Sequence, residues 1–177
     1  MSNPHWLPHT IPWNQTQGET WEQYEQRLFH VFQAEFGNQN PLLFQGEPVR
    51  FRRIPYTGIY PEAFVHLTTC KQDDSDTRLP DPLRSERIGW PRPIMENYPS
   101  CDICNYEDCV KPWVWINDKK VKIYLPNQQY LVILSQRGNQ DEGNGYWVLI
   151  TAYHLEQSHR IARIEKEYDS RFSTKVQ

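Results

Sequence analysis

The chain has 177 residues, which is long enough to bury one self-sufficient hydrophobic core and short for two domains. Its net charge of -3 and its isoelectric point near 6.1 exclude a global attraction for polyanions, so any contact with nucleic acid must be local. No apolar run approaches the roughly 20 residues that span a bilayer, and the N-terminus lacks the basic-then-apolar pattern of a signal peptide, so we expect a cytoplasmic protein without membrane contact.

The N-terminal part of the chain divides into an arm and a helix. Residues 1–19 show neither helical nor strand periodicity, which indicates an extended arm. Over residues 21–36 apolar side chains recur at steps of three and four, which predicts a helix capped by Thr20 and ended by Gly37. We expect residues 20–177 to form a single domain on which the arm docks through its tryptophans.

The middle of the chain is irregular. Prolines and glycines break it into short apolar pieces, with one short strand expected at about residues 49–53. Residues 63–69 are rich in β-branched and aromatic side chains, so we interpret them as a strand or strand end that carries His66. After an acidic loop at residues 71–76, a short helix is expected at residues 83–88.

The C-terminal part is the most regular. Four apolar stretches predict strands at residues 113–116, 120–125, 130–136 and 146–153. A hairpin loop at residues 138–145 and a closing helix at about residues 155–171 complete the chain. These elements predict an α+β fold in which the N-terminal helix packs on a four-stranded antiparallel sheet and a C-terminal helix follows.

His66 is the first candidate for chemistry, because a strand end delivers side chains into clefts. Histidine is the usual acid or base near neutral pH. Metal-free cleavage of RNA through attack of the ribose 2′-hydroxyl needs such a group, a second group that returns a proton, and donors for the charged phosphorane. The alternative is a structural histidine bonded to a neighbouring carbonyl.

Arginines supply candidates for phosphate contacts. Arg84 and Arg87 lie three residues apart in the expected helix, with Trp90 just beyond, and this combination suits a phosphate and a stacked base. Arg53 belongs to a second basic cluster, residues 50–53, and is a further candidate for substrate binding. The alternative is that these arginines are solvated or form surface salt bridges.

Thr151 and Tyr153 end the last predicted strand. The period of two along a strand points both hydroxyls the same way, so they form a candidate polar pair at the strand end. In the alternative interpretation Thr151 caps the following helix and Tyr153 packs in the core.

The four cysteines raise the question of metal binding. In a cytoplasmic protein they stay reduced, so disulfides explain them poorly. Cys101, Cys104 and Cys109 place three thiolate candidates in one short loop, which suits a structural zinc ion with Cys70 as a candidate fourth ligand. Free, partly buried cysteines are the alternative.

Four motifs, taken in their order along the chain, resemble bacterial and phage-borne proteins of the barnase, EndoU, colicin E5/D and RelE-like ribonuclease superfamily. These motifs are FRRIP at residues 51–55, FVHLT at residues 64–68, RSERIGWPRPI at residues 84–94 and ITAY at residues 150–153. The resemblance runs from about Arg50 to Tyr168. The cysteine loop and the N-terminal arm are not part of the core that the superfamily shares.

The resemblance implies a metal-independent endoribonuclease that needs no cofactor and acts as a toxin in bacterial conflict or phage defence. RNA would be its partner, together with a cognate inhibitor (antitoxin) protein. Carried over residue by residue, His66 would be the acid or base, Arg87 with Arg84 the phosphate ligands, and Thr151 with Tyr153 the strand-end pair.

Two other functions stay open. A non-catalytic RNA- or protein-binding module with a zinc-stabilised loop would use the same aromatic and arginine side chains. ADP-ribosyl transfer is the third reading, but it rests only on a short His-Leu-Thr piece. The chain has no Walker loop, dinucleotide-binding glycine turn, HExxH helix or GxSxG elbow, which disfavours ATP-driven, redox and common hydrolase functions.

Overall fold

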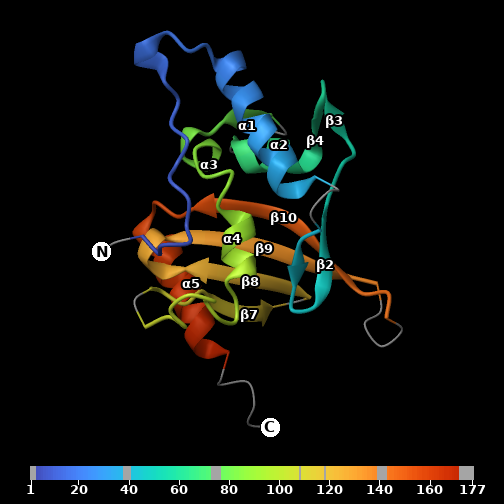
Figure 1. Ribbon diagram of the computed structural model, residues 1–177, viewed down its shortest axis with the longest axis vertical. Coiled ribbons are helices and arrows are strands. Elements are labelled where there is room, and N and C mark those ends of the chain that lie inside the picture. The colour runs from blue at the N-terminus through green and yellow to red at the C-terminus, as the bar shows by residue number, and fades with distance from the viewer. Residues whose placement is uncertain are drawn as a thin grey trace.

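A six-stranded sheet is the frame of the fold (Figure 1). The computed structural model describes residues 3–37, 41–72, 77–107, 109–117, 119–138 and 143–171. The strand order across the sheet is β1 (Leu43–Phe44), β2 (Glu47–Phe51), β10 (Tyr146–His154), β9 (Tyr130–Arg137), β8 (Lys120–Leu125) and β7 (Trp113–Asn117). Two separate two-stranded sheets pair β3 (Tyr56–Thr57) with β4 (Tyr60–Pro61), and β5 (Thr69–Lys71) with β6 (Arg78–Pro80).

The α+β class and the four predicted C-terminal strands are confirmed, but the prediction of a four-stranded antiparallel sheet is wrong. β7 to β10 form an antiparallel meander. β2 then pairs in parallel with β10, and β1 pairs with the other edge of β2 as the sixth strand. Of the predicted loops, residues 73–76 and 139–142 lie outside the described residues.

The strand β10 has two halves with different neighbours. β2 pairs only with Trp147, Val148 and Leu149. The register against β9 then shifts between Leu149 and Thr151, which places a bulge at Ile150. Beyond the bulge, the helices α2 and α3 pack against β10 where a strand would otherwise lie. Side chains from these helices can therefore reach around the edge of the sheet.

The N-terminal helix α1 (Trp21–Phe36) forms as predicted. Thr20 and Gln23 make a capping box in which each side chain accepts a hydrogen bond from the backbone N–H of the other. Phe29 and Phe32 of α1 pack edge-to-face on Phe64, and Phe32 packs in the same way on Phe51 of β2. The helix thus packs on α2 and on the β2 edge, not across the centre of the sheet (Figure 1).

The predicted strand at residues 63–69 is wrong, because most of this segment is the helix α2 (Glu62–Thr68). Its buried residues, Ala63, Phe64, Leu67 and Thr68, follow helical spacing, and this burial outweighs the strand preference of the β-branched residues. The predicted helix at residues 83–88 is shorter than expected: α3 (Pro82–Ser85) ends early. A further helix that was not predicted, α4 (Pro91–Glu96), then starts at Pro91.

The two faces of the sheet carry separate hydrophobic clusters. Val121, Ile123, Val132, Leu134 and Leu149 belong to the cluster under α1, α2, α4 and the arm. Tyr124, Leu131, Ile133 and Tyr153 belong to the cluster under α5 (Ser158–Ser170), as the period of two requires. We call these the helix-covered face and the α5 face. The closing helix begins three residues later than predicted, and none of the described helices has the length and hydrophobicity needed to cross a bilayer.

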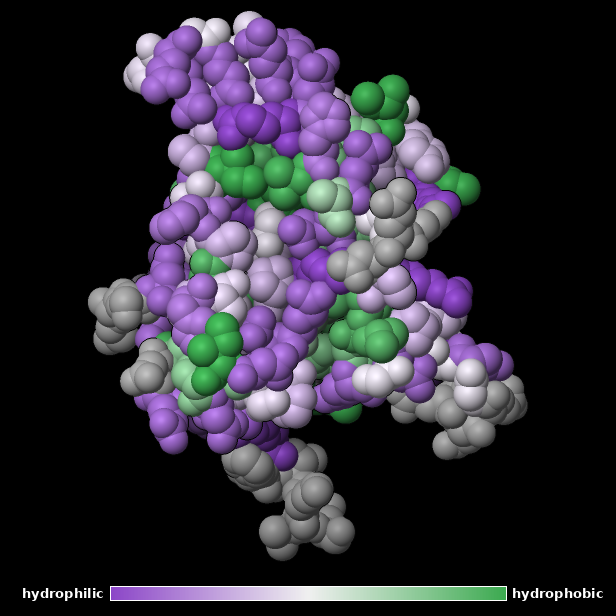
Figure 2. Space-filling view, viewed as in Figure 1, coloured by the Kyte–Doolittle hydropathy of each residue, from purple (hydrophilic) through white to green (hydrophobic). Residues whose placement is uncertain are grey.

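The N-terminal arm runs along α3 and α4 before it turns into α1 (Figure 1). The indole of Trp90 donates a hydrogen bond to the Pro8 carbonyl at 3.0 Å, and the backbone N–H of Ile11 donates to the Glu86 carbonyl at 2.7 Å. The arm is therefore fixed to the segment between α3 and α4. Figure 2 shows that the outer surface of this side is mainly hydrophilic, with hydrophobic residues at the tip of the β3–β4 hairpin, where Ile59 is exposed.

Candidate functional site

A cavity of about 310 Å³ lies between α5 and the sheet. We call it the Tyr153 pocket, and it is lined by Lys122, Leu131, Ile133, Tyr153, Leu155, Arg160, Arg163, Ile164 and Glu167. Strand period places Lys122 and Tyr153 on its floor, while Arg160, Arg163 and Glu167 recur at helical steps on the side of α5 that meets the sheet. Its size is at the lower end of the range of small-molecule sites.

Arg84 is not a lining residue but contacts one of them, Tyr153, and we call this contact region the Arg84 rim. Nη1 of Arg84 donates to the Thr151 hydroxyl at 3.4 Å and to the His66 backbone carbonyl at 3.3 Å. Its guanidinium also lies over the Tyr153 ring, 4.8 Å from the centroid. Asp81, the N-cap of α3, holds Arg84 in this position through its second carboxylate oxygen at 3.1 Å. Residues from three of the four sequence motifs, FVHLT, RSERIGWPRPI and ITAY, thus meet at the Arg84 guanidinium.

The pocket combines a protonated phenol with an excess of positive charge. Burial raises the pKa of Tyr153 above its ordinary value. The positive charges of Arg84, Arg160 and Arg163 act in the opposite direction without cancelling this rise, so the hydroxyl remains a hydrogen-bond donor at neutral pH. Lys122 is paired with Glu167 at 2.6 Å, whereas in the described part of the chain neither Arg160 nor Arg163 forms an ion pair.

His66 lies on α2 next to the bulge in β10. Burial lowers the pKa of its imidazole below the ordinary 6.5, and the positive charge of Arg78 lowers it further. A hydrogen bond to the backbone carbonyl of Ile150 and the carboxylate of Glu62, 3.8 Å away, act in the opposite direction. The ring is therefore neutral at pH 7. Its hydrogen-bond partner, Ile150, directly precedes Thr151 in β10. A bond to a backbone carbonyl is what the structural alternative for this histidine describes, and the side chain is about one-third exposed.

Arg87 and Trp90 lie apart from this rim. Because α3 ends at Ser85, Arg87 falls on the following turn and does not share a helical face with Arg84. Its guanidinium donates to the Leu83 carbonyl, pairs with Glu86 and lies over the ring of Trp90. The Trp90 ring is only 4 % exposed and packs against Tyr130 in the helix-covered cluster. The structure therefore gives Trp90 a core position.

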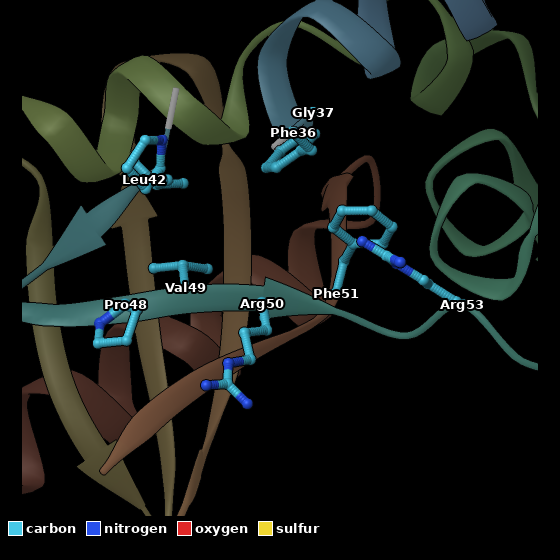
Figure 3. A pocket seen from close by; sticks show the side chains of 9 residues that line it. Phe36, Gly37, Leu42, Pro48, Val49, Arg50, Phe51 and Arg53 are labelled. Carbon is cyan, nitrogen blue, oxygen red and sulfur yellow. The ribbon is translucent and has the colours of Figure 1, made fainter. Parts of the chain in front are cut away.

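Arg53 lines a different cavity, of about 330 Å³, between β2 and the end of α1 (Figure 3). Phe36, Leu42 and Val49 form its apolar walls, and the Arg53 guanidinium lies 5.6 Å from the centroid of the Phe51 ring. The second basic cluster of the sequence is thus separate from the Tyr153 pocket.

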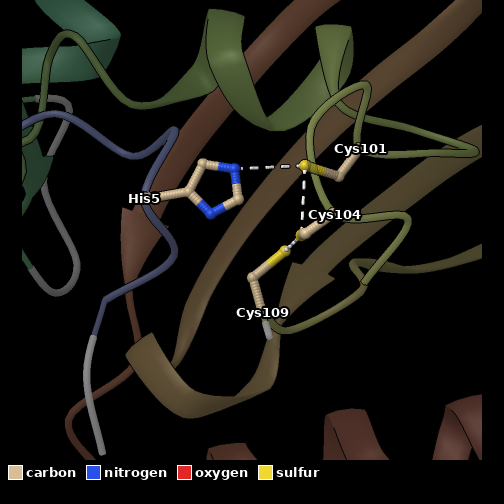
Figure 4. Close-up of side chains that lie close together, drawn as sticks. All are labelled: His5, Cys101, Cys104 and Cys109. Carbon is tan, nitrogen blue, oxygen red and sulfur yellow. Dashed lines mark hydrogen bonds between the residues drawn. The ribbon is translucent and has the colours of Figure 1, made fainter. Parts of the chain in front are cut away.

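The cysteine loop meets the N-terminal arm at a four-residue cluster (Figure 4). The Cys101 sulfur lies 3.3 Å from Nε2 of His5 and 3.5 Å from the Cys104 sulfur, which is 3.1 Å from the Cys109 sulfur. All four candidate ligand atoms lie within 4.8 Å of one another. This cluster, which we call the His5–Cys cluster, can hold a metal ion such as zinc. Cys70, the predicted candidate for the fourth ligand, lies in β5 and is not a member.

Sequence reasoning missed three contributors to these sites. Arg160 and Arg163 were not singled out because charged residues of both signs alternate along this helix, although their spacing places them beside the apolar stripe of Ile161 and Ile164. His5 lies 96 residues from Cys101, and no local spacing could link the two. Comparisons with family models, curated proteins and solved structures found no match.

Proposed function

We propose that the protein is a metal-independent endoribonuclease whose reaction takes place at the Arg84 rim of the Tyr153 pocket. The observation that carries the proposal is the convergence of Arg84, Thr151 and Tyr153 next to two arginines without carboxylate partners among the described residues. The resemblance of the four sequence motifs to the barnase, EndoU, colicin E5/D and RelE-like superfamily supports the same activity.

The reaction is a transesterification within the RNA. The ribose 2′-oxygen attacks the adjacent phosphorus while its proton passes to a base, and the bond from phosphorus to the 5′-oxygen breaks as that oxygen takes up a proton. The products are a 2′,3′-cyclic phosphate and a 5′-hydroxyl end. His66, neutral at pH 7, is the candidate base, and the protonated Tyr153 is the candidate donor to the leaving oxygen.

Arg84 is the candidate ligand of the phosphorane in this proposal, with Arg160 and Arg163 holding neighbouring phosphates. Arg87 is a weaker candidate for this role, since it is bound to Glu86 and to the Leu83 carbonyl. The acidic chain as a whole does not attract RNA, so this local group of arginines would provide the attraction.

A metal at the His5–Cys cluster has a structural role in this proposal, because no member of the cluster lines the Tyr153 pocket. The biological role that follows is that of a toxin in bacterial conflict or phage defence, with a cognate inhibitor as its protein partner. The same arginines would serve a module that binds RNA without cutting it, which is the second candidate function.

The test is RNA cleavage by purified, metal-loaded protein in a buffer free of added divalent ions. We expect total cellular RNA to be cut into fragments with cyclic-phosphate ends. Arg84→Ala should lower the rate by about 10²- to 10³-fold, the usual cost of losing one donor to a developing oxyanion.

Arg163→Ala and Lys166→Ala form a matched pair on α5, because both remove one positive charge but only Arg163 lines the pocket. Cleavage should fall in the first and stay unchanged in the second, with folding checked by circular dichroism. Intact RNA at high concentrations of folded wild-type protein would contradict the endoribonuclease proposal, and binding without cleavage would favour the non-catalytic module.

A further inference from the structure

The His5–Cys cluster has the dimensions of a tetrahedral metal site. With zinc–sulfur bonds of about 2.3 Å, the ligand atoms of a regular tetrahedron lie about 3.8 Å apart. The three contacts along the cluster are 3.3, 3.5 and 3.1 Å, and no pair of ligand atoms is further apart than 4.8 Å. A shift of a few tenths of an ångström would bring four ligands around one ion.

The backbone around Cys101 is arranged for a metal thiolate. The backbone N–H groups of Ile103 and Cys104 hydrogen-bond to the Cys101 sulfur. Asn105 and Tyr106 then turn the chain back with φ angles of 44° and 67°, in the left-handed region. This tight turn lies between Cys104 and Cys109 and brings their sulfurs to 3.1 Å from each other.

We propose that His5, Cys101, Cys104 and Cys109 bind one structural zinc ion that clasps the N-terminal arm to the cysteine loop. Three thiolates and one imidazole are a standard structural ligand set for zinc, and four protein ligands leave no open position for catalysis. The Cys101 side chain is buried, and two further aromatic side chains enclose the site. The indole N–H of Trp6, which is buried and has no hydrogen-bond partner among the described residues, lies near the Cys109 sulfur, and Tyr106 lies near the cysteine sulfurs.

The clasp determines how the arm docks. Beyond His5, the Pro8 carbonyl accepts a hydrogen bond from the Trp90 indole, and the Ile11 N–H donates to the Glu86 carbonyl. Trp90 and Glu86 both lie in the segment between α3 and α4. Release of the ion frees His5, so these hydrogen bonds lose the anchor that limits the motion of the arm. Zinc therefore fixes an arm that the sequence by itself leaves extended.

The test begins with the metal content of the full chain, purified under reducing conditions after growth with zinc. Mass spectrometry of the metals should find one zinc per chain. Cobalt in place of zinc should give the visible bands of a tetrahedral ion and the near-ultraviolet charge-transfer band of three thiolates. A folded protein that retains no metal after zinc is supplied, or that contains a Cys104–Cys109 disulfide in its place, would overturn the proposal.

Matched variants test each ligand. His5→Ala should weaken zinc binding by more than about tenfold, the cost of disturbing even an outer contact of a metal site, whereas His9→Ala in the same arm should leave it unchanged. Cys109→Ser should lose a cobalt–thiolate contribution, and Cys70→Ser should not. Equal zinc affinity in His5→Ala and His9→Ala would overturn the clasp. If Cys109→Ser does not fold, His5→Ala still decides, because it keeps all three thiolates.

Hydrogen exchange separates the clasp from a general loss of stability. Chelation of the ion should speed exchange at the Ile11 amide, which is bonded to Glu86, while amides of the β9–β10 pair keep their protection. Unchanged exchange at Ile11 after complete removal of zinc would contradict the role of the ion in holding the arm.

Discussion

The two faces of the sheet belong to the same strands but have different covers. On the helix-covered face, α2, α4 and the arm exclude water, and Ile123, Val132 and Phe64 are fully buried. On the α5 face a single helix leaves the Tyr153 pocket beside it, with Arg160 and Arg163 at its wall. Side chains that alternate along β10 thus enter two environments.

The different covers of the two faces suit different roles: the helix-covered face stabilises the fold, and the α5 face has room for a ligand. Charged groups are costly in a closed core, so they gather where the cover is incomplete. Arg84 belongs to α3, yet it reaches Thr151 and Tyr153 because β2 stops pairing at Leu149 and leaves the edge of β10 open. The short β2 is therefore as important for the candidate site as the residues that line it.

The largest expected effect is on the helix-covered face. Phe64 is 0 % exposed and packs on the rings of Phe29, Phe32 and Tyr60. Phe64→Ala should lower the free energy of unfolding by about 3–5 kcal/mol, because it removes a buried ring and leaves a cavity. Urea unfolding at pH 7 measures this change.

The matched substitution on the α5 face is Ile164→Ala. Ile164 is 8 % exposed and lines the Tyr153 pocket, so its loss should cost less, about 2 kcal/mol, at the low end for such changes. Equal losses for the two variants would show that the faces do not differ in the way their covers suggest.

The C-terminal meander was predictable because its pattern is local. β8 alternates apolar and polar side chains, and β9 and β10 are continuous apolar runs, so each reveals its own period. The parallel pairing of β2 with β10 joins residues about 100 positions apart, as in Val49 with Trp147, and a short segment interrupted by Pro48 carries no sign of its partner. The prediction of a strand in the α2 segment was wrong because its β-branched residues favour a strand while the spacing of its buried residues is helical.

The candidate site was predictable in its residue types more than in its geometry. His66, Arg84, Thr151 and Tyr153 lie close together, yet the sequence placed Arg84 and Arg87 on one helical face. The early end of α3 separates them, and its last residue, Ser85, is buried with its hydroxyl donating to the Thr68 carbonyl at 3.0 Å. Such tertiary contacts are not encoded in local spacing.

The next prediction concerns the pH dependence of RNA cleavage. The pKa of His66 lies below 6.5, so the neutral base form is present above that pKa and is lost as the pH falls through it. We expect kcat/KM to rise with pH and to level off at a lower pH than an imidazole with the ordinary pKa would give.

His66→Gln and His66→Ala separate proton transfer from support of the bulge. Glutamine can still donate to the Ile150 carbonyl but cannot titrate, whereas alanine loses both properties. If His66 is the base, both variants should lose about 10²-fold or more and the acidic inflection should vanish. An inflection that survives in His66→Gln would assign the proton to another group. His154 is the next candidate, since burial and the charge of Arg87 also lower its pKa.

The smallest expected effect concerns the charge balance at the wall of the Tyr153 pocket. Glu167 accepts hydrogen bonds from Lys122, Asn117 and the Trp115 indole. Burial of its carboxylate acts to raise the pKa, but these donors outweigh burial and hold the pKa below 4.5. A carboxyl whose pKa is lower in the folded state stabilises the fold above its unfolded pKa, and this contribution is lost as the pH falls through the folded value.

Glu167→Gln should therefore lower the free energy of unfolding by about 1.5 kcal/mol at pH 7, the scale of a hydrogen bond to a charged group. The difference from wild type should shrink as the pH is lowered below about 4.3, where the unfolded chain begins to take up the proton. Urea unfolding at pH 7 and in acid measures both values. Because the change also leaves Lys122 without its carboxylate, it makes the pocket more positive and should strengthen RNA binding. A loss of stability independent of pH would mean that Glu167 supports α5 by packing alone, and would remove the electrostatic contrast between the two faces.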